Sequence, residues 1–433
     1  MPRLGSWVRI PFLALFCPDG GIGRHAGLKI LWTLKSVWVQ VPLRVLLLNS
    51  KMLRKPLLFL FLLFIILGCS EEEEVVNNQN KEFEFLLEGN PINLSTKLNV
   101  SYFNDITVGV KEFRDDYVSL ITASGTQTIE ITGSSIENLT DSKVVLSPPG
   151  SGNLPYANYI GVGQLLKSNG KFYGLYHGEF HNGTIIEYNG VAGFYASVGL
   201  VTSEDGISFT PSQNPVIPNY LDQDYLTGFS DSGYGEPSML FSKDSSNIFV
   251  YYADHNRDRE HKGVNICMGK FDVIDGEPQF DKFYFLNDQN EFTADVIRGK
   301  EVVKGFDSFS HALFPHVTFN KSLNLYVMVL SLNAFSNNGC NSNDSGIYIT
   351  YSKDGINWID PFNENVISYI GSPKKLISEC SIPFSQTSSF AWHPSLIYTN
   401  ESQTEGYLLY SYGQSLSYPG HQLYGNKFNI ELK

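Results

Sequence analysis

Three titratable side chains occupy matching places in a repeated pair of strands, a fourth lies two residues from such a place, and together they could perform acid–base chemistry. The reference copy is the stretch 234–255, YGEPSMLFSKDSSNIFVYYADH. The matching positions in five copies are Asp105, Tyr159, Glu236, Phe314 and His393. Because side chains alternate along a strand, His316 shares a face with Phe314. Carboxyl groups can donate or accept a proton, and imidazoles can do so or bind a metal ion. We therefore expect one site made from the starts of several strands.

The spacing of these copies predicts a repeat protein made of strands. The steps between the five matching positions are 54, 77, 78 and 79 residues, so the last three are nearly equal. A regular step of this kind indicates one structural unit repeated along the chain. Helical periodicity is almost absent, whereas short runs rich in Val, Ile, Tyr and Phe alternate with Gly, Asn, Asp and Ser. The sequence therefore predicts an all-β chain.

Two further segments predict how each repeat continues. Residues 203–209 (SEDGISF) and 352–358 (SKDGINW) share the pattern Ser-x-Asp-Gly-Ile-x-aromatic. Asp-Gly favours a tight hairpin turn, and the aromatic residue after it can pack back on the same sheet. A repeat then has four antiparallel strands, and four-stranded units arranged around an axis form a β-propeller. Five such blades fit the length of the chain.

The Ser-x-Asp-Gly turn and the Glu236-Pro237 strand resemble those of five-bladed propeller glycosidases, the group around glycoside hydrolase families 43, 32 and 117. The resemblance covers about residues 96–433. It implies hydrolysis of a glycosidic bond by two carboxyl groups, with Asp105 as base and Glu236 as acid. The family pattern has another Asp in the second blade, where the matching strand offers Asn158 and Tyr159. This departure leaves open a non-catalytic, glycan-binding propeller or a purely structural one.

The same resemblance implies roles for histidines and for one charged loop. His316 and His393 become candidate metal ligands, because some relatives hold an ion, often calcium, near an axial histidine. No other cofactor is expected. Candidate contacts to the carbohydrate are Asp254, His255, Arg259, His177 and Tyr159. The first three belong to or border the charged loop 254–261, for which a solvated loop without a binding role is the alternative.

The first part of the chain predicts export. Residues 52–69 have a basic start, an apolar run and the ending Ile-Leu-Gly-Cys, which resembles a bacterial lipoprotein signal with lipid on Cys69. We interpret residues 1–51 as a start site placed too early, residues 70–95 as an acidic and polar tether, and residues 96–433 as the propeller. The expected protein is a monomer on the outer membrane, held there only by its lipid.

The net charge and the cysteines indicate which kinds of ligand and cross-link the sequence disfavours. The formal net charge is −13, and residues 1–69 hold nine basic residues and one acidic residue, so the remainder carries −21. Such a charge disfavours binding to nucleic acid. The remaining cysteines are Cys267, Cys340 and Cys380. At most one disulfide can form among them, and their spacing matches no metal motif.

Overall fold

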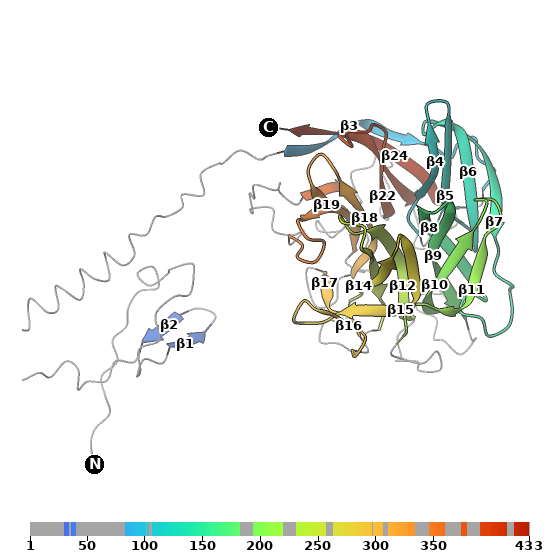
Figure 1. Ribbon diagram of the computed structural model, residues 1–433. Coiled ribbons are helices and arrows are strands. Elements are labelled where there is room, and N and C mark those ends of the chain that lie inside the picture. Colours follow the sequence, from blue (N-terminus) through green and yellow to red (C-terminus); the bar gives the residue numbers. More distant parts are fainter. Residues whose placement is uncertain are drawn as a thin grey trace, which may run out of the picture. The chain divides into compact units, whose positions relative to one another are not determined.

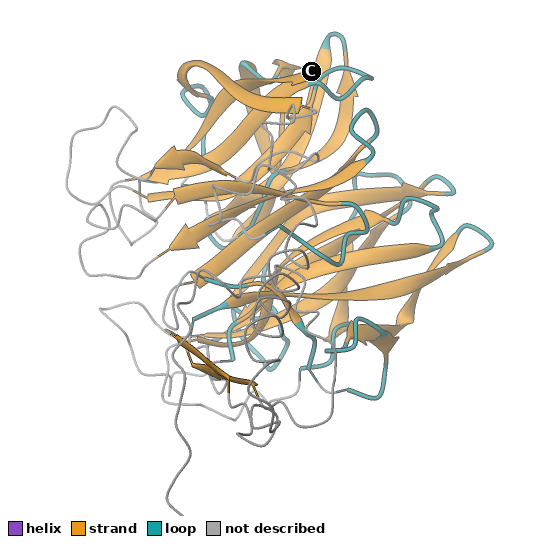
Figure 2. Ribbon diagram, turned by 90° about the vertical axis from the view of Figure 1, so that its left-hand side faces the viewer, coloured by secondary structure: helices purple, strands orange, loops and turns teal. Residues whose placement is uncertain are grey.

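The computed structural model divides the chain into two compact units, residues 1–79 and 80–433. In the first unit it describes two short paired strands, β1 (Ile30–Thr33) and β2 (Ser36–Val39). In the second it describes residues 83–100, 102–103, 106–181, 194–219, 231–256, 263–296, 298–305, 311–333, 346–359, 374–378, 390–413 and 420–432. Within these ranges every regular element is a strand (Figure 2). No helix there is long and apolar enough to cross a membrane. The all-β prediction is confirmed.

Three sheets of the second unit have four strands each (Figure 1). One contains β4 (Gly109–Arg114), β5 (Tyr117–Ser124), β6 (Gln127–Ser135) and β7 (Asn138–Leu146). Another contains β18 (His311–Asn320), β19 (Leu325–Asn333), β20 (Gly346–Ser352) and β21 (Lys374–Ser378). The third contains β22 (Phe390–Tyr398), β23 (Glu405–Gly413), β24 (Gln422–Leu432) and β3 (Phe83–Asn93). In each sheet neighbouring strands are antiparallel.

The remaining sheet has ten strands and two parts. One part contains β8 (Tyr159–Ser168), β9 (Lys171–Phe180), β10 (Phe194–Ser203) and β11 (Thr210–Pro215). The other contains β12 (Asp231–Phe241), β13 (Asn247–Asp254), β14 (Asn265–Ile274), β15 (Glu277–Leu286), β16 (Phe292–Thr293) and β17 (Glu301–Val303). The parts meet where β10 pairs with β12, and this parallel pairing covers only Phe194–Ala196 opposite Asp231–Gly233.

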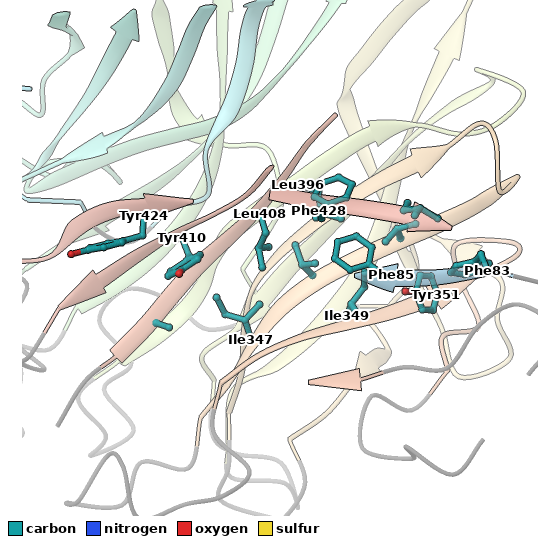
Figure 3. Packing of buried hydrophobic residues seen from close by; sticks show 14 of the residues in the cluster. Phe83, Phe85, Ile347, Ile349, Tyr351, Leu396, Leu408, Tyr410, Tyr424 and Phe428 are labelled. Atoms are coloured by element: carbon teal, nitrogen blue, oxygen red, sulfur yellow. The ribbon is translucent and has the colours of Figure 1, made fainter. Parts of the chain in front are cut away.

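Strand β3 joins the beginning of the described second unit to its end. It pairs with β24 from Phe83 opposite Leu432 to Asn93 opposite Tyr424. Phe85 stacks on Phe428 with ring centroids 4.7 Å apart, and Phe83 meets Tyr351 of β20 edge to face at 5.0 Å (Figure 3). The tether predicted over residues 70–95 therefore ends before Phe83. The alternation of Phe83 and Phe85 toward one buried face is the strand signal that the neighbouring polar residues concealed.

A β-bulge recurs in the first strand of four groups and defines their matching positions. In these bulges two residues oppose one on the partner strand, and the register shifts lie at Val162/Leu165, Gly235/Ser238, Leu313/His316 and Trp392/Ser395. Glu236, Phe314 and His393 begin their bulges with φ of +52°, +54° and +54°. The residue that begins the bulge of β8 is Gly163, so the predicted match of Tyr159 to Glu236 is wrong by four residues. That bulge lacks the proline by which the other copies were aligned.

Hydrogen bonds tie the bulged strands to one another. The Met239 amide donates to Gln164 Oε1 of β8 at 3.0 Å, and the Val317 amide donates to Ser238 Oγ of β12 at 2.9 Å. The Leu396 amide donates to His316 Nδ1 at 3.3 Å, and the Val108 amide donates to Ser395 Oγ at 2.7 Å. Thr128 of β6 bonds both the carbonyl of Ile160 and the amide of Val162 in β8. These contacts hold the bulges of successive groups close together.

Both Asp-Gly segments turn the chain, but neither closes the tight hairpin that was predicted, because Thr202 pairs with Thr210 and Ile349 with Lys374. The amides of Ile356 and Asn357 donate to Asp354 Oδ1 at 2.8 Å, and the amide of Gly355 donates to Ser352 Oγ. The aromatic residue packs differently from the prediction: Trp358 meets Tyr251 of β13, in another sheet, with ring centroids 5.6 Å apart. The turn therefore contributes to packing between sheets.

Candidate active site

Glu236 lies at the bulge of β12, and three contacts fix it. Its own amide donates to His177 Nδ1 at 3.1 Å. Its Oε2 accepts the amide of Phe314 at 3.1 Å, and its Oε1 lies 3.3 Å from His255 Nε2. Because the Phe314 amide can only donate, Oε2 must offer a lone pair. A proton carried by this carboxyl group therefore belongs on Oε1.

The local sequence explains how Glu236 reaches this position. A side chain on Gly235 would place its Cβ 2.4 Å from His177 Nδ1, so only glycine lets the imidazole approach the backbone here. Gly233 has φ of +89°, and a Cβ there would lie 2.1 Å from the carbonyl oxygen of Ala196. Pro237 has no amide hydrogen to lose within the bulge. The Gly-Tyr-Gly-Glu-Pro sequence thus sets the backbone that presents the carboxyl group.

Glu179 of β9 is a second buried carboxylate beside this strand. Its Oε1 lies 3.2 Å from His177 Nε2, and its Oε2 lies 2.7 Å from His181 Nε2. Burial raises the pKa of Glu179, but hydrogen bonds from His177 and His181 outweigh it and lower the pKa to about 2. Glu179 is therefore a carboxylate at any ordinary pH.

The structure thus corrects the expectation that the second group of strands supplies no acid. That expectation rested on the first strand of each copy, whereas Glu179 lies on the second strand. The available signal was the His-Gly-Glu sequence at 177–179, since residues two apart on a strand share a face. His177 is a predicted carbohydrate contact, but no role was predicted for its carboxylate partner.

The segment that presents His255 is held by a network around Asp254. Asp254 Oδ2 accepts Arg298 Nε at 2.8 Å, and Arg298 also donates to the carbonyl of Asn256. Asn256 Oδ1 accepts the amide of Gly233 at 3.0 Å. Asp254 is 1% exposed and its carboxylate anchors the end of β13, and the carbohydrate contact predicted for it stays a prediction. Arg259, the third candidate from this loop, lies outside the described residues.

Aromatic rings pack against the histidines that contact the two carboxylates. Phe194, where β10 meets β12, has its ring 5.9 Å from His177, 6.4 Å from His181 and 5.6 Å from His255. Tyr159 meets His177 edge to face at 5.4 Å. His177 and Tyr159 are almost fully buried. In this structure His177 contacts the backbone of Glu236, and Tyr159 packs against His177. The carbohydrate contacts predicted for both residues stay predictions.

The two candidate metal ligands are buried, neutral histidines. Burial lowers the pKa of His316 to about 3, partly opposed by a hydrogen bond with the backbone of Val108. Burial, with smaller contributions from His421 and His177, holds the pKa of His393 well below its usual value. Among the described residues no group of three or more His, Cys, Asp or Glu side chains could hold a metal ion. The metal role of both residues stays a prediction.

Several other candidates lie where the structure describes nothing. Asp105, the predicted base, is outside the described residues, and so are Cys69, Cys340 and Cys380. Cys267 is described as a buried, reduced cysteine. The pairing of the three cysteines is therefore untested.

Comparison with known proteins supports the fold and leaves the family open. No family model matches the chain, and no curated protein matches its sequence. Among solved structures, the BT0996 RGII complex is 15% identical, with a TM-score of 0.50 over 79% of this chain and 92% of that one. A thermostable family-43 glycoside hydrolase is 13% identical, with a TM-score of 0.46 over 75% and 91% of the two chains. An endo-arabinase from Bacteroides thetaiotaomicron VPI-5482 is 11% identical, with a TM-score of 0.44 over 80% and 99%.

Proposed function

We propose that this chain is a glycoside hydrolase on a five-bladed β-propeller, acting on an oligosaccharide or a polysaccharide fragment. Three blades correspond to the four-stranded sheets, and two to the parts of the ten-stranded sheet that meet at β10 and β12. The hydrogen bonds that Gln164, Ser238, His316 and Ser395 accept from the following blade support a closed order, and the contacts of Thr128 with β8 supply the fifth link. The fold of the BT0996 RGII complex supports this architecture.

The single observation that carries the enzymatic proposal is the placement of the Glu236 carboxyl group. Three bulges begin with a residue in the left-handed conformation, namely Glu236, Phe314 and His393. Only Glu236 places a carboxyl group at this position. Backbone strain of this kind costs free energy and is common at functional sites. Its Oε2 is fixed by the Phe314 amide, and its Oε1 faces His255. A carboxyl group held in one orientation suits proton transfer to a bound substrate.

In the proposed reaction Glu236 is the general acid. Its proton, on Oε1, passes to the glycosidic oxygen as the bond to the anomeric carbon breaks. Asp105 takes a proton from the water that attacks that carbon, so one water is consumed and each product gains a hydroxyl group. His255, next to Oε1, can return a proton to Glu236 from solvent. If the two carboxyl groups stand about 6.5–9.5 Å apart, the anomeric configuration is inverted.

The test is a comparison of Glu236→Gln with the native chain on a panel of oligosaccharides and 4-nitrophenyl glycosides. We expect release of sugar to be lost while the melting temperature is kept, because a glutamine oxygen still accepts the Phe314 amide. Glu130→Gln is the matched control, since Glu130 is also buried but pairs with Lys111 and Lys143 in another sheet. Native activity in Glu236→Gln would refute the assignment.

A second candidate is a non-catalytic glycan-binding propeller. The observation in its favour is that Glu236 is only 5% exposed and that its Oε2 satisfies an amide that the bulge of β18 leaves without a strand partner. A carboxylate with that task can be retained for structure alone. Tight binding of a glycan by the native chain, with no product after long incubation, would favour this candidate.

Export and lipid anchoring belong to the same proposal and are supported by residues 52–69 alone. We infer that Cys69 receives the lipid and that residues 70–82 connect it to β3 on the outer membrane. Expression in a Gram-negative host with labelled palmitate tests this directly. The native chain should take up label and partition with detergent, and Cys69→Ala should do neither. Labelling that persists in Cys69→Ala would exclude this cysteine.

A further inference from the structure

We propose that Glu179 is a positioning residue that acts through His177 on the backbone of Glu236, and that it is not a second catalytic carboxylate. The proposal rests on the function proposed above. It concerns three described residues on strands β9 and β12, which both pair with β10, and these residues are connected by two hydrogen bonds. The sequence pattern does not indicate this connection to Glu236.

The first link is between His177 and the bulge. A bulge removes the amide of its first residue from the strand ladder, and a buried amide then needs another acceptor. For Glu236 that acceptor is His177 Nδ1, at 3.1 Å. Gly235 leaves room for the imidazole, since any Cβ there would lie 2.4 Å from this nitrogen. The left-handed backbone of Glu236 is therefore held by one histidine nitrogen.

The second link fixes the tautomer of that histidine. An amide hydrogen cannot be shared with a protonated Nδ1, so the imidazole must carry its proton on Nε2. His177 is 1% exposed, and Glu179 Oε1 accepts a hydrogen bond from this Nε2–H at 3.2 Å. His181 orients the same carboxylate from the other side, at 2.7 Å from Oε2. Without an acceptor at position 179, the other tautomer would turn a second donor toward the Glu236 amide.

This role requires an acceptor at position 179 and does not require a charge. A glutamine can offer its amide oxygen to His177 Nε2 and keep the tautomer, whereas a methionine of similar length cannot. A carboxylate that took or gave a proton in the reaction would be disabled by both substitutions. The two variants therefore separate positioning from direct catalysis.

The first experiment compares Glu179→Gln and Glu179→Met on 4-nitrophenyl glycosides, with Glu130→Gln as the control for loss of a buried charge. We expect Glu179→Gln to keep kcat within about threefold of the native value. We expect Glu179→Met to lower kcat by about 100-fold with KM within about twofold, since a small misplacement of a catalytic group costs about that factor. Equal loss in both variants would make Glu179 a catalytic carboxylate, and full activity in Glu179→Met would remove its role.

A second variant protects the test against misfolding. In His177→Asn the side-chain oxygen can take the place of Nδ1 and accept the Glu236 amide without help from position 179. The double variant His177→Asn with Glu179→Met should therefore recover most of the kcat lost in Glu179→Met, a coupling that a double-mutant cycle measures. Additive losses would overturn the proposal.

Nitrogen NMR of the full chain labelled at histidine separates this proposal from the enzymatic one. His177 should show a protonated Nε2 and an unprotonated Nδ1 in the native chain and in Glu179→Gln, and should lose this pattern in Glu179→Met. If the native chain releases no sugar, the proposed function fails, and the tautomer still decides whether the connection exists. The same pattern in all three proteins would refute the connection itself.

Discussion

Replacing His316 by Gln should flatten the dependence of stability on acidity. The folded-state pKa of His316, about 3, lies below the ordinary value of 6.5 because the ring is buried. Between these two values the unfolded chain takes up a proton that the folded chain refuses. The stability that depends on a neutral His316 is therefore fully present above pH 6.5 and is lost progressively as the pH falls. The loss is about 1.4 kcal/mol per pH unit, or about 2 kcal/mol at pH 5.

Glutamine reproduces the neutral hydrogen bonds of His316 but cannot titrate. Its oxygen can accept the Leu396 amide, and its nitrogen can donate to the backbone of Val108. Urea unfolding of both proteins between pH 8 and pH 4.5 measures the difference. We expect the native free energy of unfolding to fall by about 2 kcal/mol more than that of the variant between pH 7.5 and pH 5. His393 titrates in both proteins, so its contribution cancels. Parallel profiles would refute the depressed pKa of His316.

Three further substitutions test the packing and the bulges. Glu236→Ala should lower the free energy of unfolding by about 1–3 kcal/mol because the Phe314 amide loses its acceptor, whereas Glu236→Gln should stay near the native value in the same urea titration. Gly235→Ala should cost about 1–3 kcal/mol by overpacking against His177 and should lower kcat as well; an unchanged kcat would contradict the geometry. Phe85→Ala should lower the free energy of unfolding by about 3–5 kcal/mol, measured by calorimetry, since its buried ring stacks on Phe428 of β24. A negligible loss would mean that β3 does not stabilise that sheet.

Much of the fold could be predicted because alternating apolar and polar residues indicate strands, and Asp-Gly indicates turns. The hairpin 234–255 appears as β12 and β13, and the chain turns at Asp354, where Oδ1 accepts two backbone amides. The pairing of β3 was not predicted because its partner, β24, lies more than three hundred residues away. Pairing over such a distance leaves no local signal of the partner strand. The alternation of Phe83 and Phe85 indicates only that this segment is a strand.

Glu236, the central residue of the candidate site, could be predicted from the sequence, but the residues that contact it could not. The Gly-Tyr-Gly-Glu-Pro sequence identified Glu236, because glycine and proline restrict the backbone in recognisable ways. The role of Glu179 was not predicted because it depends on a contact between β9 and β12 and on the tautomer of His177. Tyr159 was misaligned because Gly163 begins its bulge without a proline. Contacts between strands and protonation states are properties of the folded chain, which a sequence pattern does not contain.

The bulges also explain why one side chain can serve both the fold and the chemistry. In β18 the bulge leaves the Phe314 amide in need of an acceptor, and the preceding group supplies Glu236 Oε2. In β12 the same need at Glu236 is met by His177. These two bulges thus each orient a polar side chain from the preceding sheet or sheet part. The side chain oriented by the bulge of β18 is the carboxyl group of Glu236, whose other oxygen faces His255. Because the fold already restrains that carboxyl through Oε2 and the backbone amide, little further ordering is required when a substrate binds, which is the condition for efficient proton transfer.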